Sequence, residues 1–304
     1  MPGRAPKPPE LLVVKVGGSC LEELEPGWWD QLAELTSRRS ASSRRDDGAA
    51  AARVPTKLVL VHGWSRMVNA VTPEGQPDFI VDKHGFRSRY TTPAVLVEIE
   101  RVANSLRERI ANLLRERGLR TQAVSGADSR LLHAEVRQNM WWVGDELVPL
   151  TNLVGPVRDV DQARLDVLLA ENDAIVVSPL AVADGLTREV NGDGGDPGPQ
   201  HVNTDADRAA AAIAGAGSAA RLALVMDADA VHADGKPVRD AVRSDLRALA
   251  KHAKGGMAKK LRAVEEAFAG GVGHVAIGNA PVPDLLDGRA GTLIAAEPEP
   301  LPAR

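Results

Sequence analysis

The segment LLVVKVGGS, residues 11–19, joins an apolar run to a lysine and two glycines. A short apolar run rich in β-branched residues predicts a strand buried on both faces of a parallel sheet. Glycine has no Cβ and allows positive φ, so the backbone N–H groups of Gly17 and Gly18 can approach an anion closely. Lys15 adds a positive charge directed at the same anion. The segment predicts a phosphate-binding loop at the end of a central strand, with a purely structural turn as the alternative.

The spacing around this loop separates it from two common nucleotide-binding motifs. A Walker A loop requires GxxxxGK followed by Ser or Thr, and a dinucleotide fingerprint requires GxGxxG after the strand. Neither spacing occurs at this position. The predicted phosphate loop therefore belongs to another class.

A second apolar run, residues 57–61, also leads into a glycine. It continues as His62, Gly63, Trp64 and Ser65. Parallel α/β sheets bind ligands at the carboxyl ends of their strands, so the two loops are predicted to hold one phosphoryl group between them. We interpret His62 as a packed residue at the strand end rather than as a catalytic base.

Further apolar runs and the helical patterns between them set the fold class. Together they predict an α/β protein, a three-layer α/β/α sandwich with a mostly parallel central sheet. The clearest helix follows Thr92 and Pro93, an N-cap and a proline at the first helical position, and Gly118 suits its C-terminal end. The remaining predicted strands are 121–125, 174–178, 222–226 and 274–277, and two later helices are predicted over 205–214 and 258–269.

A pair of lysines near the C-terminus points to the same chemistry. The sequence GGMAKK, residues 255–260, places two glycines before a helix whose first turn contains Lys259 and Lys260. The helix dipole disfavours lysines there, whereas an anionic ligand bound by the free N–H groups would explain at least one of them. A solvated pair of charges is the alternative.

Two aspartates precede the Ala-rich helix that begins near residue 205. In VNTDADR, residues 202–208, Asp205 or Asp207 can act as the N-cap. The functional alternative is a carboxylate that orients two lysines or takes part in Mg²⁺ binding. Arg89 is a natural bidentate partner for a substrate carboxylate, although by itself it would be only a surface arginine.

Composition narrows the class of protein. The 304 residues are 44% hydrophobic and 26% charged, with a net charge of −4. These values are typical of a globular enzyme and show no excess of positive charge for nucleic acid or a membrane as partner. The single cysteine, Cys20, excludes a disulfide framework and a Cys-based metal site, and a cytoplasmic location is expected.

The ordered set of motifs resembles the amino-acid kinase family. The motifs that follow the order of N-acetylglutamate kinases and their relatives, from about residue 11 to 294, are VVKVGGS, VHGxS, GxxSRYT, VSGADSRL, VGPV, SPLAV, VNTDADRAAAAIA, GGMAKK and GGV. SRYT, VSGADSRL and VNTDADRAA lean toward kinases that act on glutamate or 2-aminoadipate attached to a LysW-type amino-group carrier protein. The resemblance implies the amino-acid kinase fold.

The resemblance also implies roles for individual side chains. Lys15 and Lys260 match family lysines that neutralise the transferring phosphoryl group, and Asp207 matches the aspartate that positions them. Arg89 and Asn203 match residues that hold the amino-acid part of the substrate.

The two glycine loops match family segments whose amides contact the phosphoryl group. Gly17, Gly18 and Gly63 correspond to those glycines. Trp64 stands where family members usually have another glycine. It still has a backbone N–H, but a positive φ would be strained there, and the indole should reshape the substrate pocket.

The resemblance divides the chain into two lobes. Residues 1–190 are expected to bind the amino-acid substrate, and residues 200–304 to bind ATP. Asp227 lies near the family's nucleotide segment, and Gly256 and Met257 open the helix that carries Lys260.

Composition also marks segments added to this scaffold. Residues 36–55 are polar and low in complexity and are predicted to be a mobile insertion. Residues 191–199, NGDGGDPGP, have loop chemistry throughout, and the tail after residue 294 is expected to be disordered.

The implied reaction is ATP- and Mg²⁺-dependent phosphorylation of the side-chain carboxylate of an acidic amino acid blocked at its α-amine. A carboxylate is already ionised at pH 7, so positioning and neutralisation of charge suffice without a general base. The block prevents the amine from attacking the acyl phosphate and forming a lactam. The alternatives are an N-acetylglutamate kinase that acts on the free small molecule, and a non-catalytic, kinase-like binding subunit.

The resemblance implies two protein partners. One is a small acidic amino-group carrier protein, which Arg38, Arg39, Arg44 and Arg45 could help to dock, although a solvated loop is the favoured interpretation of these arginines. The other is a second copy of the chain, because family members commonly form dimers through the N-terminal half. Glutamate, 2-aminoadipate and a modified analogue all remain open as the substrate.

Overall fold

A computed structural model describes residues 10–36, 56–64, 67–68, 77–83, 85, 87–136, 140–150, 152–187, 199–253 and 255–297. The predicted insertion therefore lies outside the described residues except for Thr36, as do Ser65, the four arginines at 38, 39, 44 and 45, and all of the predicted loop 191–199 except Pro199. In the described part of the chain, no helix has the length and apolar character needed to cross a membrane.

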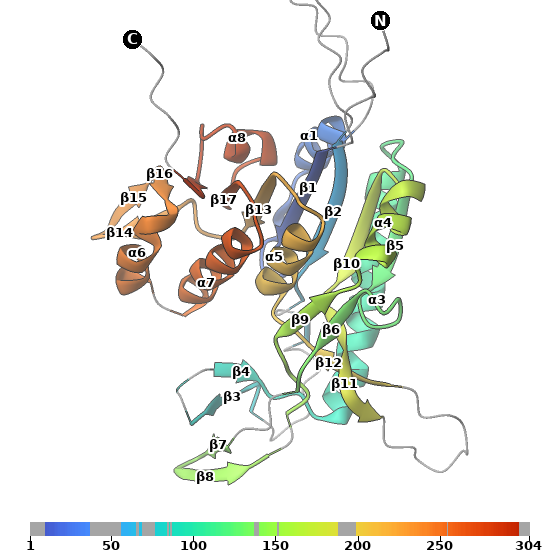
Figure 1. The fold of residues 1–304 in the computed structure, drawn as a ribbon, viewed down its shortest axis with the longest axis vertical. Coiled ribbons are helices and arrows are strands. Elements are labelled where there is room, and N and C mark those ends of the chain that lie inside the picture. Colours follow the sequence, from blue (N-terminus) through green and yellow to red (C-terminus); the bar gives the residue numbers. More distant parts are fainter. Residues whose placement is uncertain are drawn as a thin grey trace, which may run out of the picture.

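An eight-stranded sheet forms the centre of the molecule, in the order β16-β18-β17-β13-β1-β2-β10-β5 (Figure 1). Its six parallel strands are β1 (Glu10–Val16), β2 (Thr56–His62), β5 (Thr121–Ser125), β10 (Ala174–Ser178), β13 (Arg221–Val225) and β17 (His274–Gly278). These are the six strands predicted from the sequence. The two strands that the sequence did not reveal, β18 (Thr292–Ala295) and β16 (Asp240–Val242), extend one edge, and β18 runs antiparallel to β17.

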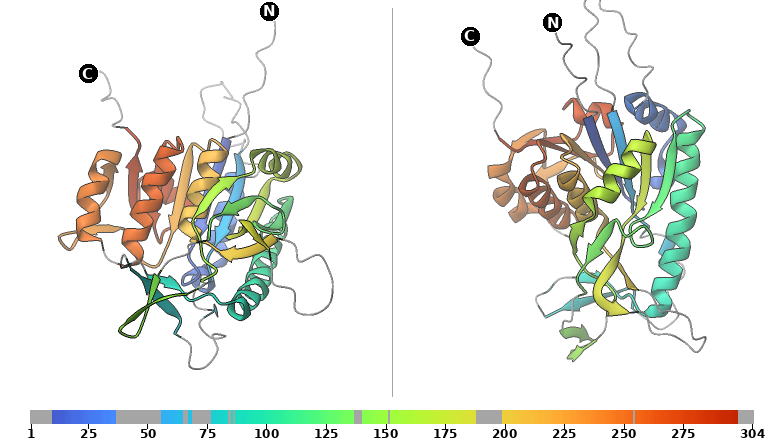
Figure 2. Two further views of the ribbon diagram at one scale, coloured as in Figure 1. Left: turned by 60° about the horizontal axis from the view of Figure 1, so that its bottom comes forward. Right: turned by 45° about the vertical axis from the view of Figure 1, so that its right-hand side comes forward.

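Helices cover both faces of this sheet, which confirms the predicted three-layer α/β/α architecture (Figure 2). One face carries α4 (Gln162–Glu171), α5 (Ala206–Ala216) and α7 (Gly256–Ala269). The other carries α1 (Pro26–Thr36), α3 (Pro93–Arg115) and α8 (Val282–Leu286). The short helix α6 (Leu246–His252) packs against α7. Because both faces are covered, the strands need apolar residues on both sides, as the continuous runs indicated.

The predicted helix boundaries follow from local chemistry. Thr92 accepts a hydrogen bond through Oγ1 from the Val95 N–H at 3.3 Å, and Pro93 opens α3. Gly118 adopts φ +83°, and its N–H donates to the Arg115 carbonyl at 2.9 Å. A residue with a Cβ would be strained at that φ, so the glycine ends the helix as predicted.

Smaller sheets lie beyond the carboxyl ends of the central strands (Figure 1). One contains β12 (Pro199–Asn203), β11 (Leu180–Thr187), β6 (Leu132–Ala134) and β9 (Val157–Val160), and another contains β4 (Arg87–Arg89), β3 (Phe79–Asp82), β7 (Met140–Val143) and β8 (Glu146–Pro149). A hairpin pairs β14 (Val231–Ala233) with β15 (Lys236–Val238). Many of these strands have only three or four residues, too few for a periodic pattern, so the sequence analysis did not find them.

The central sheet joins the two expected lobes. Strand β1 pairs with β2 on one side and with β13 on the other, so residues assigned to the two lobes share one continuous sheet. The lobe boundary is therefore not a break in the core.

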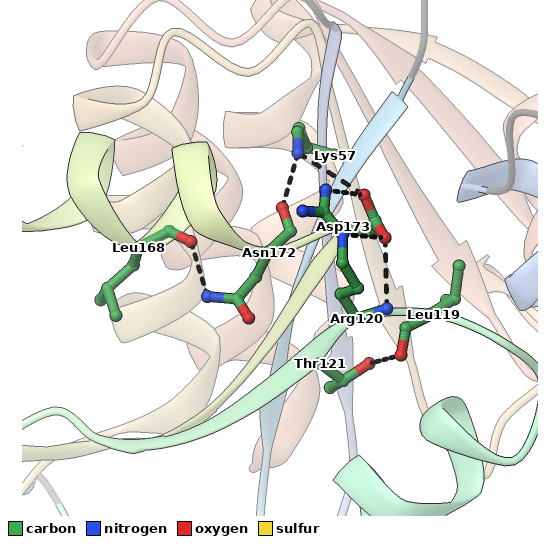
Figure 3. A network of polar contacts seen from close by, with 7 residues as sticks. All are labelled: Lys57, Leu119, Arg120, Thr121, Leu168, Asn172 and Asp173. Atoms are coloured by element: carbon green, nitrogen blue, oxygen red, sulfur yellow. Dashed lines mark hydrogen bonds and ion pairs between the residues drawn. The ribbon is translucent and has the colours of Figure 1, made fainter.

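A polar network holds the amino-terminal edge of the sheet (Figure 3). Arg120 donates from Nε and Nη2 to the Asp173 carboxylate at 3.0 and 2.8 Å, and its backbone N–H donates to the same group at 3.2 Å. Lys57 Nζ donates to the Asn172 carbonyl at 2.6 Å and lies 3.7 Å from Asp173. The contacts tie the starts of β2, β5 and β10 together.

Candidate active site

Three charged side chains meet at the carboxyl edge of the sheet. Lys15, near the end of β1, places Nζ 2.8 Å from Oδ1 of Asp207, in the first turn of α5. Lys260, near the start of α7, donates from Nζ to Oδ2 of the same carboxylate, also at 2.8 Å. The side chains are 7%, 7% and 13% exposed for Lys15, Asp207 and Lys260. The structure thus brings together two predicted lysines and the predicted aspartate.

Each of the three charged groups shifts the pKa of its neighbours. Burial alone would raise the pKa of Asp207, but the two ammonium groups outweigh burial and lower it below its ordinary value. Burial opposes the charge on Lys15, yet the Asp207 carboxylate raises the pKa of this lysine. Burial and the neighbouring charge of Lys15 lower the pKa of Lys260, with Asp207 opposing them. The group holds two positive charges and one negative charge, so it carries an excess of positive charge for an anionic ligand.

The structure separates the two aspartates that the sequence left as alternatives. Asp205 is the N-cap of α5, and its Oδ1 accepts hydrogen bonds from the N–H groups of Asp207 and Arg208 at 3.0 and 3.2 Å. Asp207 lies inside the first turn and faces the lysines. The cap and the lysine-orienting carboxylate are therefore two different residues.

Helices α5 and α7 lie side by side with their N-termini at this site. The contact between Asp207 and Lys260 joins their first turns, and Gly215 contacts Gly270 at their C-terminal ends. Helix α7 follows Gly255, which has φ +56°, and no side chain of the described residues caps it. The uncapped N–H groups at the start of α7 and the aligned dipoles of the two helices add to the positive potential of the lysines.

The two glycine loops touch each other. A Cβ on Gly63 would lie 2.9 Å from the Gly18 nitrogen, a distance that real Cβ atoms essentially never show. None of Gly17, Gly18 and Gly63 has a positive φ. Glycine is therefore needed at position 63 for close approach, and the conformational freedom invoked in the sequence analysis is not used.

Two of the backbone N–H groups that were predicted to bind the phosphoryl group are hydrogen-bonded within the protein. The Gly17 N–H donates to the Val225 carbonyl at 3.0 Å, and the Gly63 N–H donates to the Val16 carbonyl at 2.9 Å. These two amides fasten the loops to neighbouring strands. The N–H groups of Gly18 and Trp64 have no acceptor among the described residues, so these two are the donors that can face a ligand.

Trp64 and His62 are both buried at the end of β2. Trp64 is 6% exposed and has no positive φ, and its ring packs edge to face against the His62 ring at 5.8 Å. His62 shares a 3.0 Å hydrogen bond between Nε2 and Ser178 Oγ, and burial lowers its pKa from 6.5 to about 4. The imidazole is thus a neutral, packed group, which agrees with our interpretation, and the indole joins the core.

Arg89 and Asn203 are connected through Thr91. Asn203, at the end of β12, donates from Nδ2 to Thr91 Oγ1 at 3.3 Å, and Thr91 Oγ1 donates to the Arg89 carbonyl at 3.4 Å. The Arg89 guanidinium lies 3.7 Å from Asp78 and 4.8 Å from the centre of the Phe79 ring. Burial lowers the pKa of Arg89, although Asp78 opposes the shift. Arg89 is 8% exposed, so it is not the surface arginine of the alternative interpretation.

The residues predicted to bind the nucleotide lie after strand β13 and at the start of helix α7, in the C-terminal part of the chain. Asp227 lies two residues beyond β13, whose last residue, Val225, accepts the Gly17 N–H. Gly256 and Met257 form the first turn of α7. Within the described residues, no group of three or more His, Cys, Asp or Glu side chains could hold a metal ion.

Sequence reasoning missed several residues that build this site. Thr91 and Asn152 support Asn203 and β4, since Asn152 Oδ1 accepts the Thr91 N–H at 2.8 Å. Arg208 and Glu266 connect α5 to α7. Arg208 directly follows Asp207 in the motif, which was the only local signal; the identity of its partner depends on how the helices pack.

Comparisons with known proteins agree with this geometry. The family described as "Amino acid kinase family" matches residues 10–279. A protein of Aeropyrum pernix, provisionally named a LysW-aminoadipate/LysW-glutamate kinase, is 31% identical over 93% of this chain and 97% of its own length. A LysW-aminoadipate/LysW-glutamate kinase of Saccharolobus solfataricus is 30% identical over 79% of this chain and 89% of its own.

Solved structures share the fold. N-acetylglutamate synthase of Neisseria gonorrhoeae, complexed with coenzyme A and N-acetylglutamate, has a TM-score of 0.68 at 22% identity over 95% of this chain and 60% of its own. Carbamate kinase of Giardia lamblia bound to AMP-PNP has a TM-score of 0.59 at 14% identity over 95% of this chain and 99% of its own. From the family match and the curated relatives, this chain belongs to the amino acid kinase family.

Proposed function

We propose that this protein uses ATP to phosphorylate the side-chain carboxylate of glutamate or 2-aminoadipate whose α-amine is joined to a LysW-type amino-group carrier protein. The observation that carries the proposal is the pairing of Lys15 and Lys260 across the Asp207 carboxylate, each at 2.8 Å. The product would be an acyl phosphate.

The charge of the site suits phosphoryl transfer. An ammonium group has three N–H donors, and among the described residues Lys15 and Lys260 each contact Asp207 alone. The remaining donors can bind the oxygens of a transferring phosphoryl group from two sides. Asp207 fixes both lysines before the substrate binds, so little reorganisation is needed when negative charge develops.

Backbone groups complete the phosphate site in this proposal. The N–H groups of Gly18 and Trp64 are available, and the N-termini of α5 and α7 point to the same place. The described residues therefore fit the phosphates of ATP. Trp64 can serve as a donor through its backbone, because it has no positive φ and its indole is buried.

Both oxygens of Asp207 face lysines, which favours its orienting role over direct Mg²⁺ binding. Mg²⁺ is commonly held by phosphate oxygens with one or two carboxylates, and it would enter this site together with ATP and neutralise charge on the phosphates. Asp227, Gly256 and Met257 are proposed to contact the nucleotide.

Arg89 and Asn203 are proposed to hold the amino-acid part of the substrate. The names of the relatives from Aeropyrum pernix and Saccharolobus solfataricus, which refer to LysW-linked aminoadipate and glutamate, support the carrier-bound substrate. We propose residues 1–190 as the lobe for the amino acid and residues 200–304 as the lobe for ATP, with Asn203 at the start of the second lobe beside Thr91 of the first. A homodimer is part of the same proposal.

The test is to trap acyl phosphate with hydroxylamine. The protein receives ATP and Mg²⁺ with carrier-linked glutamate, carrier-linked 2-aminoadipate or N-acetylglutamate in parallel. We expect hydroxamate on a carrier-linked substrate, and its loss in a Lys15→Met variant, because the phosphoryl charge is then left without one of its two lysines.

The other outcomes would replace the proposal. Hydroxamate from N-acetylglutamate alone would indicate a kinase of the free small molecule. No hydroxamate from any substrate, with no binding of ATP, would indicate a non-catalytic binding subunit.

A further inference from the structure

We infer that Arg208 and Glu266 form a positioning pair that keeps Lys260 opposite Asp207. The inference rests on the proposed function only in the role given to Lys260. Arg208 follows Asp207 on α5, and Glu266 lies six residues beyond Lys260 on α7. The pair therefore connects the same two helices as the contact between Asp207 and Lys260.

The contact between the two side chains is strong and directional. Arg208 Nε lies 3.0 and 2.7 Å from the two Glu266 oxygens, and Nη2 lies 2.7 Å from Oε1. The side chains of Arg208 and Glu266 are 17% and 35% exposed. A planar guanidinium that meets both oxygens of a carboxylate fixes distance and orientation, unlike a single surface ion pair.

The C-terminal ends of the two helices meet through a pair of glycines. At the C-terminal ends of the helices, a Cβ on Gly215 or Gly270 would lie 3.1 or 2.9 Å from the Cα of the other glycine. Two glycines allow close approach, but they provide no directional contact. At the other end, α7 begins at Gly256 after Gly255 without a side-chain cap among the described residues.

A small slide would disrupt the site. One residue of helix corresponds to a rise of about 1.5 Å, which is enough to take a 2.8 Å contact out of hydrogen-bonding range. The ammonium group of Lys15 contacts the same Asp207 carboxylate and repels that of Lys260. The Arg208 pair opposes this displacement by fixing α7 along α5.

The chain offers a matched control. Arg262, on α7, lies 3.5 Å from the same Glu266 carboxylate, but both residues belong to one helix. Replacing Arg262 removes this intrahelical ion pair from Glu266 and leaves the contact between Arg208 and Glu266 in place. A general effect on Glu266 would appear in both variants, whereas a positioning effect would appear only when Arg208 is replaced.

The first measurement does not depend on the reaction. Lysines of the full chain are acetylated with acetic anhydride and quantified by peptide mass spectrometry, with the exposed Lys236 as reference. We expect Arg208→Gln to raise the acetylation rate of Lys260 by about fivefold or more, because the side chain leaves its contact with Asp207, and Arg262→Gln to leave it within about twofold. An unchanged rate in Arg208→Gln would overturn the inference.

The second measurement uses the trapped acyl phosphate. Arg208→Gln should lower kcat by about 10- to 100-fold with a change in KM of less than about threefold, since a displacement near 1 Å affects chemistry more than binding. In a Lys260→Met background, the same substitution should change the residual kcat by less than about twofold, because its effect passes through Lys260. Equal losses in both backgrounds would contradict the inference.

Exchanging the charges of Arg208 and Glu266 distinguishes loss of their ion pair from misfolding. The double variant Arg208→Glu with Glu266→Arg should regain kcat to within about fivefold of the original protein, while each single variant stays low. A double variant as impaired as the singles would overturn the inference. If acetylation responds as expected but no substrate gives hydroxamate, the positioning pair stands and the proposed function fails.

Discussion

Asp207 and Asp173 each lie between two cationic side chains, at opposite edges of the same sheet. Asp207 contacts Lys15 and Lys260 at the carboxyl edge, and Asp173 contacts Arg120 and Lys57 at the amino edge (Figure 3). The two groups have the same charge composition. Only one of them is suited to bind a ligand.

The difference lies in what the cations do with their remaining donors. At the amino edge, Arg120 donates two side-chain hydrogen bonds and one backbone hydrogen bond to Asp173, and Lys57 also donates to the Asn172 carbonyl. At the carboxyl edge, the lysines contact a carboxylate and keep donors for a further anion. The N-terminus of α7, which has no side-chain cap among the described residues, begins one turn before Lys260 in that group. Charge composition alone therefore does not identify a site.

The largest effect is expected when the carboxylate at the carboxyl edge loses its charge. Asp207→Asn should lower kcat by about 10³-fold, because the two ammonium groups lose the charge that holds them in position. Trapped hydroxamate measures the loss. A reduction below tenfold would remove Asp207 from the catalytic group.

Gly63→Ala tests the close approach of the two loops at the carboxyl edge. The added Cβ would meet the Gly18 nitrogen at 2.9 Å, so the loop must shift, and we expect kcat to fall by about 10- to 100-fold. Gly27→Ala is the control, because a Cβ at that helical position meets no atom within 4 Å. Equal activity of the two variants would show that loop contact is dispensable.

His62, at the carboxyl edge, makes the free energy of unfolding of the chain depend on pH. Its pKa of about 4 in the folded chain lies below the ordinary 6.5, so above pH 6.5 it is neutral in both states. As the pH falls from 6.5 to 4, the unfolded chain binds a proton that the folded chain excludes, and stability decreases. Between pH 7 and 5 the loss should be about 2 kcal/mol.

Urea unfolding at the two pH values measures this effect. His62→Gln should show a smaller loss of stability between pH 7 and 5 than the original chain, because glutamine does not titrate. The same pH dependence in both proteins would contradict the assignment to His62.

Asp173→Asn should have the smallest effect. The pKa of Asp173 is lowered to about 2, chiefly by its hydrogen bond with Arg120, so the carboxylate is the form that the fold stabilises. Because the group is partly exposed, we expect a stability loss of about 1 kcal/mol and kcat within about twofold. A large loss of kcat would show that the two edges are coupled.

Much of the fold was readable from local sequence. Six apolar runs gave the six parallel strands, because strands buried on both faces need continuous apolar residues. Thr92, Pro93 and Gly118 gave the limits of α3 through capping and φ requirements that act within a few residues. The strands of the small sheets were not predicted, since most of them have only three or four residues, too few for a periodic signal.

The sequence by itself predicted a phosphate-binding context for Lys15 and for Lys259 or Lys260, and a cap or lysine-orienting carboxylate at position 205 or 207, because a strand end, a helix start and paired glycines are local features. The tertiary structure alone decided that Asp205 caps α5 while Asp207 meets both lysines, and that the N–H groups of Gly17 and Gly63 bind neighbouring strands. Those outcomes depend on contacts between segments far apart in the chain, whose relative positions are set by packing of the whole core.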